Sequence, residues 1–323
     1  MREAAFIQRN KEKWRRLEQV LAHRDQGLSA DESSSLYIEL TDDLSYARTF
    51  FPGTEVTSYL NELAVGMHQH VHKNQKTTSG RFITFWTREL PLLMARTRPQ
   101  LLIAAGVFFI SCAIGALSAH YDSTFTRLIM GDGYVDMTLE NIKNGKPMDV
   151  YGGDHEMDMF FQITLNNIMV SLMAFAAGAI FSYGTWMMLM YNGVMLGCFQ
   201  YFMFQHGVGR ESVLSIWIHG TIEISSIVIA GGAGIVMGNG LLFPGTYTRL
   251  ASFRHSAKDG LKIVFGLVPC FIIAGFLESF VTRHSPIMYT EVSVSIIGAS
   301  LAFIIGYFIL YPFNAEGRLR NAD

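Results

Sequence analysis

The chain has 323 residues, of which 50% are hydrophobic and 16% are charged. Because a soluble domain carries about 25% charged residues, this deficit favours an integral membrane protein. The formal net charge of −2 gives no support to a nucleic-acid partner, and we expect none. The three cysteines lie in apolar runs without CxxC spacing, so we expect no disulfide framework, no metal site and no other cofactor.

Residues 1–98 are predicted to form a helical region on the cytoplasmic side of the membrane. Apolar residues recur at helical spacing in three stretches of this region. The three predicted helices cover residues 3–22, 31–46 and 56–72. The stretch 81–94 mixes aromatic residues with arginines, which is typical of a helix on the membrane surface; a fourth packed helix is the alternative.

Six stretches are long and apolar enough to cross a membrane, which takes roughly 20 residues. The uncharged run between Asp158 and Arg210 is too long for one crossing at about 1.5 Å per residue, so we expect a two-span hairpin with a turn at 182–185. The other predicted spans lie near 101–119, 213–239, 260–282 and 290–311. The predicted fold is therefore all-α, a polytopic helical membrane protein.

These spans divide the chain into a few segments. A six-span domain at 99–315 follows residues 1–98, an external loop occupies 119–164, and a tail occupies 316–323. Lysine and arginine gather on the side of both termini, whereas residues 119–159 hold three basic residues against eight acidic ones. Because basic loops stay inside, we expect cytoplasmic termini and a place in the bacterial inner membrane.

Three ionisable residues fall inside the predicted spans, where each costs about 2.5–3.5 kcal/mol on insertion scales. His219 and Glu223 are four residues apart in the fourth span, so they share one face of its helix. Glu278 lies near the same end of the fifth span, and Asn166 and Asn167 begin the second span on that side. The five residues are predicted to form one intramembrane polar cluster in the outer half of the membrane.

This polar cluster has three interpretations. It is a structural clasp if its groups hydrogen-bond one another across the helices. It is a binding site if its two buried, neighbouring carboxyl groups take up a proton, a cation or a small polar ligand. A metal hydrolase is the third interpretation, but His219 and Glu223 alone are too few ligands and the sequence lacks HExxH.

Glycines gather in the other half of the fourth span. Gly231, Gly232, Gly234 and Gly238 lie there, the last two at GxxxG spacing. Small residues let helix backbones approach closely inside a membrane, so we expect tight packing within the chain. A homodimer seam and an unwound helix segment are the alternatives.

Several short motifs occur together along the chain. They are Asn166-Asn167, Asn192-Gly193, His219-Gly220-x-x-Glu223, Gly231-Gly232-Ala233-Gly234, Pro244-Gly245 and Glu278-Ser279-Phe280-Val281-Thr282. Trp14, Leu36-Tyr37 and the stretch 43–48 fit the same pattern. With these motifs the chain resembles the stage II sporulation protein M family of integral membrane proteins over most of its length. Ser279 departs from the glycine that is common at that position.

The resemblance implies partners rather than a known activity. The family's namesake acts in forespore engulfment beside partners that remodel peptidoglycan, and many members occur beside MoxR-type ATPases in bacteria that form no spores. We therefore predict a non-enzymatic scaffold in an envelope-associated assembly, surrounded by membrane lipid and docking protein partners through residues 1–98 and the external loop. The alternative is a transporter or channel-like protein with a proton, ion or small polar ligand site in the outer half of the membrane.

Overall fold

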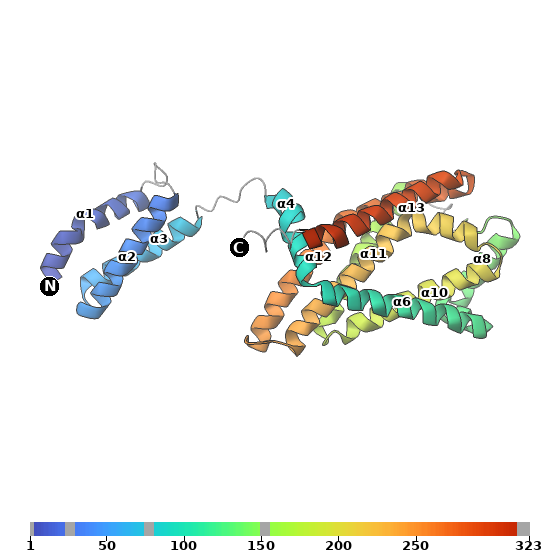
Figure 1. Ribbon diagram of the computed structural model, residues 1–323, viewed down its shortest axis with the longest axis horizontal. Helices are drawn as coiled ribbons and strands as arrows, with labels where there is room; N and C mark the ends of the chain where they lie inside the picture. The colour runs from blue at the N-terminus through green and yellow to red at the C-terminus, as the bar shows by residue number, and fades with distance from the viewer. Residues whose placement is uncertain (1–2, 23–29, 74–80, 149–155, 315–323) are drawn as a thin grey trace. The chain divides into compact units, whose positions relative to one another are not determined.

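The computed structural model describes residues 3–22, 30–73, 81–148 and 156–314 of the chain (Figure 1). Within these ranges every regular element is a helix, which confirms the all-α prediction. The chain forms two compact units, Met1–Phe82 and Ile83–Asp323. The boundary lies before the 98/99 division predicted from the first span, because residues 83–96 pack with the membrane helices. The predicted tail at 316–323 lies outside the described residues.

The first unit consists of α1 (Glu3–Ala22), α2 (Ala30–Phe50) and α3 (Glu55–Lys73). Its core is formed by the apolar residues that recur at helical spacing, and Leu17, Leu40, Leu60 and Met67 are fully buried. The Trp14 indole donates a hydrogen bond of 2.9 Å to Asp43 and so ties α1 to α2. Because the unit buries a core of its own, its three helices stabilise one another.

The second unit begins with a helical stretch interrupted by a π-helical turn. The stretch comprises α4 (Arg81–Thr84), which crosses the boundary between the units, η1 (Phe85–Glu89) and α5 (Leu90–Arg96). Tyr307 donates a hydrogen bond of 2.6 Å to the Trp86 carbonyl, and Leu90 contacts Gly266 of the fifth span. This stretch is therefore helical and contacts the spans, and whether it also lies on the membrane surface stays a prediction.

Six helices in the described part of the second unit are long and apolar enough to cross a membrane, as predicted. The first four are α6 (Arg98–Tyr121), α9 (Glu156–Ala176) with the 3₁₀ turn η3 (Ala177–Ala179), α10 (Tyr183–Gln205) and α11 (Gly209–Leu242). The fifth is α12 (Arg249–Phe276) with η4 (Leu277–Val281) and η5 (Thr282–Ile287), and the sixth is α13 (Thr290–Ile304) with η6 (Ile305–Leu310). Helix α11 contacts all five other spans and forms the centre of the unit.

Helices α6 and α10 run side by side along a seam of small residues (Figure 1). A Cβ atom at Gly197 would overlap the Cys112 carbonyl oxygen and lie 2.7 Å from the Cys112 carbonyl carbon. A Cβ atom at Gly193 would lie 2.6 Å from the Phe108 carbonyl oxygen. Only glycine lets the two backbones approach this closely, so these positions fix the distance between the helices.

The four glycines singled out on the fourth span lie in a continuous helix, α11, and each faces another helix of the same unit. A Cβ atom at Gly231 would lie 2.6 Å from the Leu189 side chain of α10. At Gly232 it would lie 2.5 Å from the Leu101 side chain of α6. The contacts of these glycines within the chain follow the intramolecular packing that we expected of them.

The other two glycines of this set pack on the hairpin between α9 and α10. A Cβ atom at Gly234 would lie 2.7 Å from the Ala174 carbonyl oxygen, and one at Gly238 would lie 2.4 Å or less from Ser182 atoms. Phe181 and Ser182 turn the hairpin with positive φ angles of 50° and 64°. Left-handed backbone at residues other than glycine costs about 1–3 kcal/mol each and persists where packing fixes it, here against α11.

The hairpin turn occupies Ile180–Ser182, before most of the predicted 182–185 stretch, and α10 already begins at Tyr183. Gly184 is not used for the turn. A Cβ atom at Gly184 would lie 2.7 Å from the Ala177 carbonyl oxygen, so this glycine lets the two arms of the hairpin approach each other.

Two short helices, α7 (Ser123–Met130) and α8 (Asp132–Lys143), occupy the predicted external loop, and α9 begins before the predicted loop end at residue 164. Asp122 caps α7, and its hydrogen bonds from the Thr124 hydroxyl and amide lower the pKa of this carboxyl group. Arg127 pairs with Asp132 at 3.1 Å and joins the two helices. Of the eight acids on this side, Asp149 and Asp154 lie outside the described residues.

Candidate functional site

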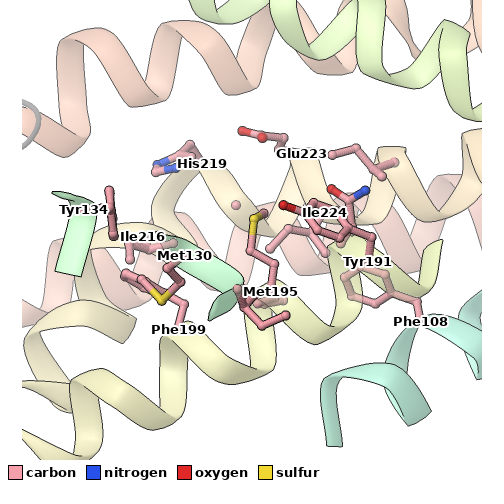
Figure 2. A pocket seen from close by; sticks show the side chains of 15 residues that line it. Phe108, Met130, Tyr134, Tyr191, Met195, Phe199, Ile216, His219, Glu223 and Ile224 are labelled. Carbon is pink, nitrogen blue, oxygen red and sulfur yellow. The ribbon is translucent and has the colours of Figure 1, made fainter. Parts of the chain in front are cut away.

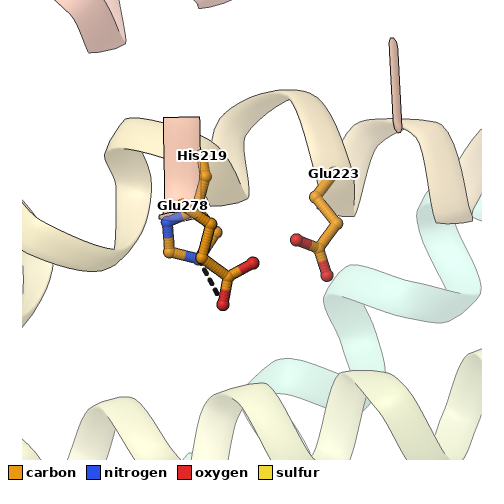
Figure 3. Close-up of side chains that lie close together, drawn as sticks. All are labelled: His219, Glu223 and Glu278. Atoms are coloured by element: carbon orange, nitrogen blue, oxygen red, sulfur yellow. Dashed lines mark ion pairs between the residues drawn. The ribbon is translucent and has the colours of Figure 1, made fainter. Parts of the chain in front are cut away.

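Three of the predicted cluster residues come together in the structure. His219 and Glu223 lie one turn apart on α11, and Glu278 reaches them from η4 (Figure 3). One side-chain nitrogen or oxygen atom from each residue lies within 4.8 Å of the other two. The His219 Nε2 atom is 3.8 Å from Glu278 Oε1, and the two side chains are only 6% and 13% exposed.

Neighbouring residues orient two members of this cluster. The Nδ1 atom of His219 lies 3.0 Å from the Thr282 hydroxyl oxygen, so the opposite ring nitrogen is turned toward Glu278. Asn167 on α9 is buried and lies close to Glu223. Three spans therefore contribute to the arrangement of the cluster.

A π-helical turn places Glu278. Helix α12 ends at Phe276, and residues Leu277–Val281 form η4 before the 3₁₀ turn η5. A π turn holds one more residue than an α turn, which rotates the side chains that follow it, and such turns are frequent at functional sites. Here Glu278 lies near the start of the turn, Thr282 follows its last residue, and both side chains reach His219.

The two asparagines predicted on α9 point in different directions. Asn167 is buried and reaches Glu223, whereas the Asn166 side chain is exposed on the surface of the helix. Successive residues of a helix are rotated by about 100°, so two adjacent asparagines cannot face the same interior. The structure therefore does not bring Asn166 into the cluster.

A cavity of ≈ 450 Å³ lies against the cluster, between α6, α10, α11 and the short helices α7 and α8 (Figure 2). His219 and Glu223 line it, and Asn192 and Tyr134 add polar groups to a wall that is otherwise mainly apolar. Burial raises the pKa of the Tyr134 phenol, which lies on α8 outside the spans. Glu278 is not among the lining residues.

Asn192 is the cavity residue that sequence reasoning missed. The predicted cluster did not include it, yet its side chain on α10 lines the cavity with Glu223. The cavity is deep enough to extend from Tyr134 on α8 to Asn192. The Asn192-Gly193 motif was the available signal, because the glycine packs on α6 while the asparagine lines the cavity.

The cluster combines residue types that can bind ions and protons. It offers one imidazole nitrogen and two carboxylate groups, which together bind protons and divalent cations. The cavity places His219 and Glu223 within reach of a small molecule or water. Its apolar residues lower the local dielectric, which strengthens any electrostatic interaction made there.

A family model described as Stage II sporulation protein M matches residues 104–283, which are 180 of the 323 residues. The chain belongs to the stage II sporulation protein M family. The match runs from α6 into η5 and includes every residue of the cluster, and with its six spans this family member is a membrane protein. A second model, Domain of unknown function (DUF8413), matches residues 4–73, which cover α1 to α3. No curated protein and no solved structure matches the chain.

Proposed function

We propose that this family member binds a small polar ligand or ion through His219, Glu223 and Glu278. The ligand enters from the outer side of the membrane. The observation that carries the proposal is the cavity that His219 and Glu223 line. A clasp that only joins helices needs no cavity beside its polar groups, whereas His219 and Glu223 line one here.

Charge supports the proposed orientation. Helix α12 begins with the basic residues Arg249, Arg254, Lys258 and Lys262, whereas the segment 119–159, which contains α7 and α8, has eight acidic and three basic residues. The positive-inside rule thus favours cytoplasmic termini in a bacterial inner membrane, with α7 and α8 outside. Since α7 and α8 border the cavity, this orientation gives the ligand access from the outer side.

Cysteine labelling tests the access route. Cys112, Cys198 and Cys270 are first replaced by alanine, and Gly220→Cys then places a thiol on the cavity wall. A Cβ atom at Gly220 meets no atom closer than 3.4 Å, so the substitution fits. Gly298→Cys on α13 is the matched control, because its Cβ atom meets nothing within 4 Å and the proposed topology places it facing lipid.

We expect a membrane-impermeant maleimide to label Gly220→Cys and not Gly298→Cys when it is added to spheroplasts, whose inner membrane is intact and exposed. Failure to label a folded Gly220→Cys protein, when the same thiol reacts after denaturation, would overturn the proposal. Labelling only from the cytoplasmic side of inverted vesicles would contradict the orientation.

We also propose that the protein works without catalysis, as a component of an envelope-associated assembly. The first unit supports this role, because it has its own core and its own family match and is therefore suited to docking a partner. The charged helices α7 and α8 offer a second docking surface. Protein partners, including a second copy of the chain, would dock at either surface. Membrane lipid would surround the spans.

Site-specific photo-crosslinking in native membranes tests this role. A photoreactive residue at Ile38, which is 60% exposed on α2, should give a protein adduct of discrete mass. The same residue at Leu102, 65% exposed on α6, is the control for contact with lipid alone. An adduct of twice the mass would identify a second copy. A full set of exposed first-unit positions that yields no protein adduct would overturn the assembly role.

A further inference from the structure

The ligand set of the cluster defines the class of ligand more narrowly. We propose that His219, Glu223 and Glu278 bind a divalent transition-metal ion, an inference that rests on the proposed binding function of the same cavity. The sequence argued against a metal because His219 and Glu223 alone are too few ligands. Glu278 supplies the third, from a different span and through a π turn.

The geometry is close to that of a bound ion. Imidazole nitrogens and carboxylate oxygens bind such ions at about 2.0–2.2 Å, so two ligand atoms on one ion lie within about 4 Å of each other. The three ligand atoms already lie within 4.8 Å of one another. A side-chain rotation of the two glutamates closes the remaining gap, because each carboxylate is at the end of a three-bond side chain and faces the cluster.

Two of the three ligands have the partners that metal sites use. A metal-binding histidine is held by a hydrogen bond at its other nitrogen, and the Thr282 hydroxyl lies 3.0 Å from Nδ1 of His219. Metal-binding carboxylates are hydrogen-bonded in turn, and Asn167 lies close to Glu223, where its amide can serve this purpose. These contacts leave Nε2 of His219 directed toward Glu278.

Charge balance favours a divalent ion. Two ionised carboxylates and a neutral imidazole carry two negative charges, which a divalent cation cancels inside the membrane. The basic residue nearest to Glu278 in sequence, Arg283, forms an ion pair with Glu156 at 3.0 Å. One nitrogen and two oxygen ligands favour zinc, iron, cobalt or manganese over calcium and magnesium, which prefer oxygen alone.

Three protein ligands leave at least one coordination position for another group. Because His219 and Glu223 line the cavity and Glu278 lies behind them, that position faces the cavity. A bound ion would therefore be able to exchange water for a small anionic or carbonyl group of a ligand within the ≈ 450 Å³ space.

Cobalt binding to the full-length protein tests the proposal. The protein is purified with an affinity tag that lacks histidine, stripped with chelator, returned to lipid nanodiscs and titrated with Co²⁺. We expect one ion per chain, with the visible absorption bands of Co²⁺ in a site of low coordination number. His219→Gln and Glu278→Gln should abolish these bands. His284→Gln is the matched control, because His284 is exposed on η5 and should leave them unchanged.

Thr282→Val gives a graded result, because it keeps the side-chain shape and removes the partner of His219. We expect Co²⁺ affinity to fall about 10- to 100-fold. Wild-type protein that binds no Co²⁺, or bands that survive both ligand substitutions, would overturn the metal site. If Gly220→Cys is labelled from outside while Co²⁺ fails to bind, the cavity function stands and only the metal proposal falls. If Co²⁺ binds and Gly220→Cys stays unlabelled, the metal site stands and only access to the cavity from the outer side is overturned.

Discussion

Replacing Gly197 with alanine should loosen the seam between α6 and α10. The new Cβ atom would overlap the Cys112 carbonyl oxygen and lie 2.7 and 2.9 Å from the Cys112 carbonyl carbon and Cα. All three are backbone atoms, so the helices must move apart. Overpacking of this kind costs about 1–3 kcal/mol, and a backbone clash lies at the upper end. Alanine returns about 1 kcal/mol through its helix propensity.

The expected net destabilisation of Gly197→Ala is therefore about 2 kcal/mol, which changes the folding equilibrium about 30-fold. Gly106→Ala on α6 is the matched control, because nothing lies within 4 Å of its Cβ position and only the gain in propensity applies. Unfolding in mixed micelles of increasing SDS content measures both. A Gly197→Ala protein as stable as the wild type, or a Gly106→Ala protein that is equally destabilised, would refute the account of the seam.

Three further predictions concern ionisable groups. Glu278→Gln should leave the spans folded yet remove the thermal stabilisation that Co²⁺ gives the wild type; a folding defect without any ligand would instead favour the structural clasp. Burial and the hydrogen bond to Glu18 raise the pKa of Tyr59 to about 12, so the folded state holds this proton more tightly than the unfolded state, and the first unit should lose stability as pH rises from about 10 to 12. Tyr59→Phe should flatten that loss in an alkaline titration followed by circular dichroism. Arg127→Gln should change stability by less than about 1 kcal/mol, because its ion pairs are exposed, and a larger loss on thermal unfolding would show that α7 and α8 depend on them.

The spans and their number could be predicted because the thickness of a bilayer sets a minimum apolar length, and the charges at 158 and 210 bound a run too long for one crossing. The family could be predicted from the order of its motifs. The directions of single side chains could not. A span is apolar on nearly all sides, so its sequence hardly marks the face that points inward, and Asn166 and Asn167 looked equivalent.

Two local features also escaped prediction for physical reasons. The π turn at Leu277–Val281 is a change of hydrogen-bond register, and apart from Glu278 its residues are ordinary for a span. The hairpin turn at Ile180–Ser182 uses left-handed backbone at Phe181 and Ser182, which glycine usually supplies. Packing against Gly238 of α11 overrides that local preference, and only the tertiary structure shows this contact.

The glycines and the polar cluster of α11 are parts of one arrangement. Gly234 and Gly238 fix the depth and rotation of the α9–α10 hairpin on α11. The same hairpin carries Asn167 to Glu223 and Asn192 to the cavity. Along α11, Glu223 lies about 16 Å from Gly234 at about 1.5 Å per residue. A binding site needs its groups held within roughly 0.5 Å of their working positions, so a shift of the hairpin should reach it.

Gly234→Ala tests this coupling. Its Cβ atom would lie 2.7 Å from the Ala174 carbonyl oxygen and must displace the hairpin. We expect the folded variant to bind Co²⁺ more weakly than the wild type, with the loss of affinity confined to the metal site. Gly106→Ala should bind as the wild type does, because its Cβ atom enters open space. Unchanged Co²⁺ affinity in a destabilised Gly234→Ala protein would show that the glycine seam holds the helices together without setting the geometry of the cluster.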